Sequence, residues 1–129
     1  MKQNRVNAVL RHLEQLGLSQ MLITDPISIF YLTGRMIHPL ERFYGLYLSR
    51  RGDHRIFINQ LESVPEDLGV EKVRFSDTDP YLDLVAETVD HREPLGVDKN
   101  MAARFLLPLM ERSAASGFVL SSLAVDRAR

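Results

Sequence analysis

Two aspartates two positions apart, Asp77 and Asp79, have the spacing in this sequence that best suits a catalytic site. Such a pair after a strand can hold Mg²⁺ while one carboxylate attacks a phosphate. That chemistry usually places the pair after the first strand and needs a downstream lysine and further acidic residues. Here the pair follows a later predicted strand, with Pro80 directly behind it. The pattern favours a simpler interpretation, in which Asp77 ends the strand and Asp79 caps the next helix. A magnesium-dependent phosphohydrolase is the alternative.

Two more aspartates, Asp25 and Asp98, also follow predicted strands. Together with Asp77 and Asp79 they could converge at the carboxyl ends of parallel strands, where open α/β sheets bind ligands. Each is also explained as a helix-cap or turn residue. A phosphoacceptor signalling domain has a similar length, but it should carry an acidic pair after its first strand, where Asp25 stands alone. A free-standing interaction domain needs no site and is a further alternative.

Residue types and spacing exclude several other chemistries. The seven glycines are never closer than seven positions, which excludes a dinucleotide fingerprint and a phosphate loop. No two of the four histidines have helical metal-ligand spacing, and the absence of cysteine excludes disulfides, thiolate catalysis and cysteine-ligated metals. A Ser-His-Asp triad is not excluded by spacing, but no Gly-x-Ser-x-Gly motif supports one. We therefore expect no metal and no cofactor in this chain.

Length and composition predict one α/β domain over residues 1–129. The chain is 45% hydrophobic and 26% charged, as in ordinary globular proteins, and a domain has about 150 residues. Its net charge of −1 provides no field to attract nucleic acid or an anionic membrane. No long apolar run or signal-peptide core is present, so we expect neither a membrane partner nor export, and a cytoplasmic location.

The hydrophobic periodicity predicts strands that alternate with helices, plus one hairpin. The expected strands cover residues 21–24, 43–48, 55–59, 70–75, 95–97 and 117–120, and the expected helices cover 6–16, 27–32, 81–89 and 102–110. Pro108 should kink or shorten the last helix, and the polar stretch 121–129 is typical of an interdomain connection. Four aromatic residues are expected to fill the core rather than to form a stacking platform: Tyr31, Phe43, Tyr44 and Tyr47. These elements predict a mixed sheet of five or six strands with helices on both faces.

The stretch 22–34, Leu-Ile-Thr-Asp-Pro-Ile-Ser-Ile-Phe-Tyr-Leu-Thr-Gly, resembles the N-terminal domain of the creatinase/prolidase/aminopeptidase P family. In that family an apolar strand, a helix start and Tyr-Leu-Thr-Gly follow one another early in the chain. The likeness continues through Glu41-Arg42, the hairpin at 43–59, Asp79-Pro80, the stretch 95–98 and the stretch 125–129. It thus covers nearly the whole chain, and Tyr-Leu-Thr-Gly is its most specific part. The resemblance implies a fold similar to ribonuclease H, without nuclease activity.

The resemblance also implies a parent enzyme that cleaves bonds to proline, most closely a Xaa-Pro dipeptidase. Its relatives carry a larger C-terminal "pita-bread" domain, in which two aspartates, a histidine and two glutamates hold two divalent metals, commonly manganese or cobalt. Those ligand motifs are missing from this chain. We therefore expect a non-catalytic domain that partners its own C-terminal catalytic domain and a second subunit of a homodimer. Dipeptidase and aminopeptidase specificity both stay open.

The loop at 35–44 is the predicted functional segment, because its charged residues directly follow Tyr31–Gly34 and the resemblance implies that this domain overhangs a catalytic cleft. Its charged residues Arg35, His38, Glu41 and Arg42 can all make charge-assisted hydrogen bonds, and Pro39 limits its conformations. The hypothesis is that this loop reaches toward an active site, excludes long peptides or binds a substrate carboxylate. The alternative is a solvated loop in which Glu41 and Arg42 only pair locally, with a contribution of about 0–1 kcal/mol.

Overall fold

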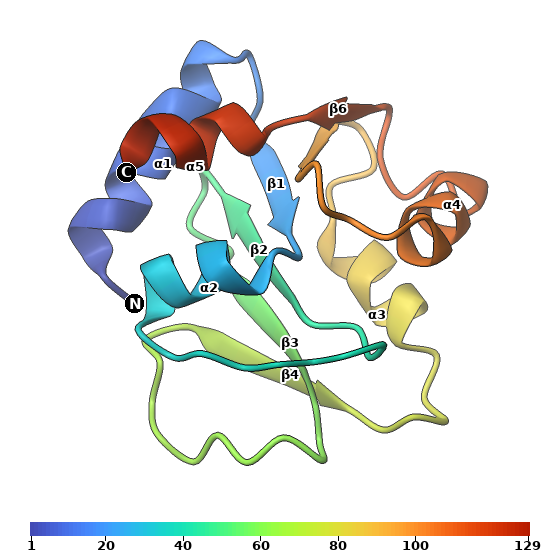
Figure 1. Cartoon of the computed structure of the whole chain (residues 1–129). Coiled ribbons are helices and arrows are strands. Elements are labelled where there is room, and N and C mark those ends of the chain that lie inside the picture. Colours follow the sequence, from blue (N-terminus) through green and yellow to red (C-terminus); the bar gives the residue numbers. More distant parts are fainter.

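Six strands form one mixed sheet in the order β4-β3-β2-β1-β5-β6, seen in the computed structural model of residues 1–129 (Figure 1). The strands are β1 (Gln20–Ile23), β2 (Gly45–Ser49), β3 (Arg55–Asn59), β4 (Glu71–Phe75), β5 (Leu95–Val97) and β6 (Phe118–Leu120). The helices are α1 (Gln3–Gln15), α2 (Pro26–Thr33), α3 (Tyr81–Thr88), α4 (Ala103–Glu111) and α5 (Ser122–Ala128). The predicted fold class, a mixed sheet of five or six strands with helices on both faces, is confirmed.

Only β2 runs against the other five strands. It pairs antiparallel with β1 and β3, whereas the β3–β4, β1–β5 and β5–β6 pairs are parallel. The carboxyl ends of the other five strands therefore lie at one edge of the sheet. The loop that leads from α2 into β2 reaches the sheet at this same edge, because β2 begins where its neighbours end.

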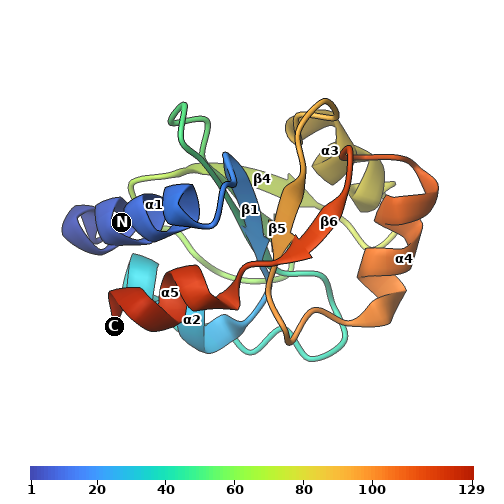
Figure 2. The same cartoon turned by 90° about the horizontal axis from the view of Figure 1, so that it is seen from above.

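Helices cover both faces of the sheet. Figure 2 shows α1, α2 and α5 on one face, with α3 and α4 on the other. Successive strand residues point to opposite faces, so Met21 and Ile23 join the core under α1, α2 and α5, while Leu22 joins the core under α3 and α4. The strands β1 and β2 are buried along their whole length, as expected for a sheet covered on both faces.

The position of α2 can be predicted from the sequence, because the residues that cap both of its ends lie next to it in the chain. The carboxylate of Asp25 accepts a hydrogen bond from the backbone N–H of Ser28, and Pro26 occupies the first helical position. Gly34 ends the helix with a left-handed backbone (φ +81°), which glycine adopts without steric cost. This cap fixes the point at which the chain leaves α2 and enters the loop that starts at residue 35.

One local prediction is wrong, and two others are only partly tested. In the expected interdomain connection at 121–129, Ser122–Ala128 form helix α5, which packs against α1 through buried Ala124 and Val125, and its role as a connection stays a prediction. Pro108 lies inside α4, which continues to Glu111, so it does not shorten that helix, while the expected kink stays a prediction. Asp79 does not cap α3, because its carboxylate accepts the backbone N–H of Ser76 (2.7 Å). None of the five helices is long and apolar enough to cross a membrane.

Candidate functional site

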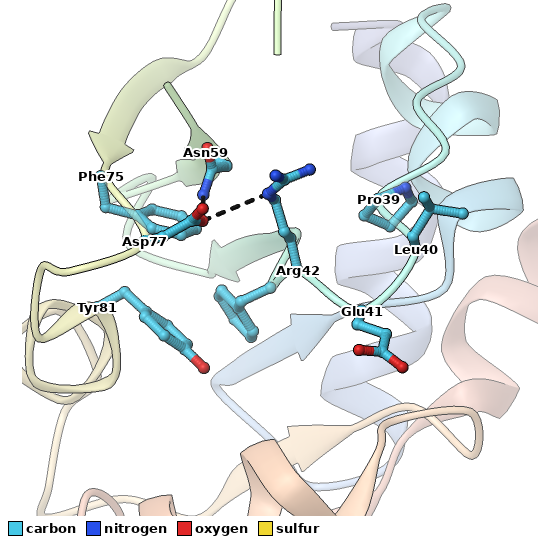
Figure 3. A pocket seen from close by; sticks show the side chains of 9 residues that line it. Pro39, Leu40, Glu41, Arg42, Asn59, Phe75, Asp77 and Tyr81 are labelled. Atoms are coloured by element: carbon cyan, nitrogen blue, oxygen red, sulfur yellow. Dashed lines mark hydrogen bonds and ion pairs between the residues drawn. The ribbon is translucent and has the colours of Figure 1, made fainter. Parts of the chain in front are cut away.

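A cavity of about 700 Å³ opens at the carboxyl edge of the sheet (Figure 3). The loop between α2 and β2 forms one wall, and the ends of β3 and β4 with the start of α3 form the other. Its nine lining residues are Pro39, Leu40, Glu41, Arg42, Phe43, Asn59, Phe75, Asp77 and Tyr81. The topology brings these segments together, because β3 and β4 end at the edge that the loop crosses on its way into β2.

A chain of polar contacts runs across this cavity. The Nε of Arg42 donates to Oδ1 of Asp77 (3.3 Å), and the amide Nδ2 of Asn59 donates to the same oxygen (2.7 Å). The Asn59 side chain is held in turn, since its Oδ1 accepts the backbone N–H of Leu61 (2.9 Å). Neither terminal nitrogen of the Arg42 guanidinium donates to another protein atom. Those two nitrogens can therefore bind a carboxylate or phosphate in a bidentate manner.

Packed aromatic rings form the floor of the cavity. Phe43 and Phe75 each stack on Tyr81, with ring centroids 5.7 and 5.2 Å apart, and Phe105 meets Phe43 edge to face at 5.0 Å. Phe43 and Phe75 are buried. Three of the aromatic residues expected to fill the core, Phe43, Tyr44 and Tyr47, do so. The rings of Phe43, Phe75 and Tyr81 also give the cavity a rigid apolar floor beside the charge of Arg42.

The loop is held from two directions at its tip. The carbonyl of Glu41 accepts a hydrogen bond from Nη2 of Arg104 on α4 (3.1 Å), while the neighbouring Arg42 bonds Asp77 on the other side. Between Pro39 and this anchor, Leu40 has a left-handed backbone (φ +56°) and an 85% exposed side chain. That backbone costs a residue other than glycine about 1–2 kcal/mol. The loop thus holds an apolar side chain in an exposed position at the rim of the cavity.

Only two of the four loop residues singled out by the sequence reach the cavity. Glu41 and Arg42 line it, whereas Arg35 turns away to the carboxylate of Glu66 (2.8 Å) and the carbonyl of Ser63 (2.9 Å). His38 is exposed and makes no hydrogen bond. Arg42 pairs with Asp77 and not with its neighbour Glu41. The charged residues of this loop thus lie in two separate regions, one at the cavity and one beside Glu66.

The four aspartates of the alternative phosphate sites have separate structural uses. Buried Asp98 accepts the N–H (2.7 Å) and hydroxyl (2.9 Å) of Thr24, and burial raises the pKa of its carboxyl. Asp25 caps α2, Asp77 binds Arg42 and Asn59, and Asp79 closes a turn. Asp25 and Asp98 share a pocket of only about 20 Å³. No three His, Asp or Glu side chains gather closely enough to hold a metal ion.

Asn59 and Tyr81 are site residues that sequence reasoning missed. Asn59 is the polar last residue of a buried strand and is itself only 2% exposed. A buried amide needs hydrogen-bond partners, so its position at a strand end was a usable signal. Tyr81 follows Asp79-Pro80 at the start of α3, where nothing in the local sequence separates a cavity residue from a core residue.

Comparisons with known proteins point to one family. The sequence profile of the Creatinase/Prolidase N-terminal domain matches residues 5–129. An uncharacterized peptidase of Staphylococcus haemolyticus is 24% identical over 95 residues, which are 74% of this chain and 24% of that protein. The chain thus spans about a quarter of that curated relative.

Two solved structures show the same fold. The N-terminal domain of an X-Pro dipeptidase from Streptococcus pyogenes superposes with a TM-score of 0.79 at 18% identity, covering 98% of this chain and 99% of that one. Dipeptidase PepE from Mycobacterium ulcerans superposes with a TM-score of 0.81 at 28% identity. That match covers 99% of this chain but only 36% of the mycobacterial dipeptidase.

Proposed function

The chain belongs to the Creatinase/Prolidase N-terminal domain family, and from this premise we propose that it is the non-catalytic N-terminal domain of a metal-dependent Xaa-Pro dipeptidase. The observation that carries the proposal is the extent of the likeness. The family profile matches residues 5–129, yet these residues correspond to about a third of a whole dipeptidase. In this proposal, hydrolysis belongs to a C-terminal catalytic domain outside the 129 residues.

The metals of the parent enzyme do not fit the donors of this chain. Two divalent ions, manganese or cobalt, would need carboxylates and a histidine that converge, and no such group exists here. The proposal therefore places both ions in the C-terminal domain. What this chain contributes is shape and charge at the rim of the cleft.

The cavity at the carboxyl edge supports a role at that rim. Arg42 presents two unbonded guanidinium nitrogens next to an aromatic floor, a combination suited to a carboxylate beside an apolar ring. A Xaa-Pro dipeptide ends in such a group, because its C-terminal carboxylate is attached to the proline ring. Glu41 and Arg42 are thus the proposed substrate-facing residues, while Arg35 points away from the cavity and holds the loop to Glu66 and Ser63.

Exposed apolar side chains support contacts with further protein. Leu120 is 69% exposed on the edge strand β6, and Leu123 is 51% exposed at the start of α5. Together with Leu40 on the loop, they offer surface to the C-terminal domain or to a second subunit of a homodimer. Arg35 and His38, which do not line the cavity, stay proposed partner-facing residues of the loop.

Hydrolysis of a Xaa-Pro dipeptide tests the proposal. The 129-residue chain and the longest product of its gene should each be assayed with Mn²⁺. We expect activity only in a product that extends beyond residue 129. Turnover by the 129-residue chain alone would contradict the non-catalytic assignment. Mg²⁺-dependent hydrolysis of an aryl phosphate that depends on Asp77 and Asp79 would favour the phosphohydrolase instead.

A further inference from the structure

We propose that Asn59 and Asp77 are positioning residues that aim the guanidinium of Arg42 at the substrate's carboxylate. The inference rests on the proposed function, and it adds Asn59 at the end of β3 and Asp77 in the turn after β4 to the substrate-facing residues proposed on the loop. Neither residue is proposed to touch the reacting atoms. Their work is to fix the direction of one side chain on another segment.

The geometry of the three side chains carries this inference (Figure 3). Leu61 N–H fixes the orientation of the Asn59 amide, so that Nδ2 faces Asp77 and Oδ1 faces away from it. Asp77 Oδ1 then accepts from both Asn59 and Arg42. Asn59 is 2% exposed at the end of a sheet strand, so the sheet holds its side chain in place. Through Asp77, this restricts the orientation of the longer Arg42 side chain.

The bond that Arg42 makes leaves its binding capacity intact. Asp77 engages Nε, the inner nitrogen of the guanidinium, at 3.3 Å. The two terminal nitrogens remain available as a planar fork for an external carboxylate. If the pair served stability alone, it would be worth little, because the Arg42 and Asp77 side chains are 39% and 57% exposed. The ion pair therefore matters more for the orientation of the Arg42 guanidinium than for the stability of the fold.

The chain offers a matched control for such a pair. Asp83 on α3 accepts from Nε of Arg112 at 2.6 Å, with exposures of 52% and 37%. This ion pair has the same chemistry and similar exposure as the pair of Asp77 and Arg42. Neither of its residues lines the cavity. Asp83→Asn therefore removes a comparable surface ion pair without disturbing the proposed site.

The first test observes Arg42 directly in the 129-residue chain. A domain of this architecture exists as a separate crystallised chain in the S. pyogenes protein. The NMR signal of the Arg42 Nε–H should exchange slowly with water in the wild type and rapidly in Asp77→Asn and in Asn59→Ala. Asp83→Asn should leave it unchanged. Slow exchange that persists in Asn59→Ala would overturn the positioning role of Asn59.

The second test uses the intact peptidase with a Xaa-Pro dipeptide. Asp77→Asn and Asn59→Ala should each raise KM about fivefold, as expected from losing one oriented hydrogen bond, with kcat nearly unchanged. In an Arg42→Ala background neither change should add to KM, and Asp83→Asn should behave as wild type. A fall in kcat at constant KM, or an additive effect in that background, would overturn the inference.

The two tests separate this inference from the proposed function. If the intact wild-type protein does not hydrolyse Xaa-Pro dipeptides, the proposed function fails, and the positioning inference fails with it as a statement about substrate. If hydrolysis occurs and the Nε–H signal responds as expected while KM stays constant, Asn59 and Asp77 hold Arg42 for another purpose. That result also overturns the inference, but it leaves the assignment to a dipeptidase standing.

Discussion

Neighbouring atoms decide what each aspartate at the carboxyl edge does. Asp25 and Asp79 both precede a proline at the start of a helix, so the sequence assigns them the same capping role. Only Asp25 fills it, because its carboxylate reaches the backbone N–H and hydroxyl of Ser28. Asp79 turns back to Ser76, and Pro80 occupies the N-cap position of α3. The difference arises in the turn before the helix, whose conformation the Asp-Pro sequence alone does not specify.

The cap of α2 leads to a stability prediction. Asp25→Ala should lower the free energy of unfolding by about 1 kcal/mol, since a backbone N–H at the helix start loses its partner. Asp79→Ala should lower it less, because Asp79 is exposed and caps no helix. Urea denaturation of both variants and the wild type measures the two effects. An equal loss in both variants would contradict the assigned roles.

His54 makes the stability of the fold depend on pH. Burial lowers the pKa of its imidazole, and its Nδ1 lies 3.2 Å from the backbone N–H of Ser49, which a neutral ring can accept. The unfolded chain takes up the proton near pH 6.5. The folded state therefore has its full stability above that pH and loses stability as the pH falls toward the lowered pKa of His54.

Replacing His54 by asparagine tests this pH dependence. The amide oxygen of His54→Asn can accept the Ser49 N–H without titrating. The variant should lose the part of the stability decline below pH 6.5 that comes from His54. Urea denaturation between pH 5 and pH 8 measures it in both proteins. Identical slopes in the wild type and the variant would show that His54 has no part in the decline.

At the scale of elements, β5 approaches the turn into α5 so closely that only glycine fits at its centre. A Cβ at Gly96 would lie 2.6 Å from both Cβ and Oγ of Ser121, and 3.2 Å from Cδ1 of Leu18. Ser121 is fully buried, and its hydroxyl has no hydrogen-bond partner. This contact fixes where the segment after β6 returns across the sheet.

Gly96→Ala should therefore destabilise the protein by about 1–3 kcal/mol through overpacking. Gly117→Ala is the matched control, because a Cβ there meets no atom within 4 Å and the backbone is not left-handed. Its effect should stay within about 0.5 kcal/mol. Thermal or urea unfolding measures both variants. A neutral Gly96→Ala would mean that β5 and the turn at Ser121 are less closely packed than described.

Elements with a complete local code could be predicted from the sequence, and the others could not. Helix α2 carries its aspartate cap, its proline and its left-handed Gly34 within ten residues, so its position follows directly. Helix α5 is only seven residues long and has no side-chain cap, and its packing on α1 through Ala124 and Val125 stabilises it. That contact joins opposite ends of the chain, which local periodicity does not detect.

For the molecule as a whole, the family resemblance predicts the fold but not the site. The Tyr-Leu-Thr-Gly segment and the order of strands lead to the correct sheet, whereas the cavity depends on contacts between distant residues. Arg42 and Asp77 are 35 positions apart, and Asn59 and Asp77 are 18 apart. Only the parallel pairing of β3 with β4 brings them to the loop. The sequence accordingly singles out Arg42 but misses its partner Asn59.

The intact mass of the native protein in its source cells tests the central claim most directly. If the chain is the N-terminal domain of a dipeptidase, mass spectrometry of the native protein should give a mass well above 14.8 kDa, with the catalytic domain in the same polypeptide. A native mass of 14.8 kDa would contradict the claim, and the likeness to peptidases would then reflect shared ancestry alone.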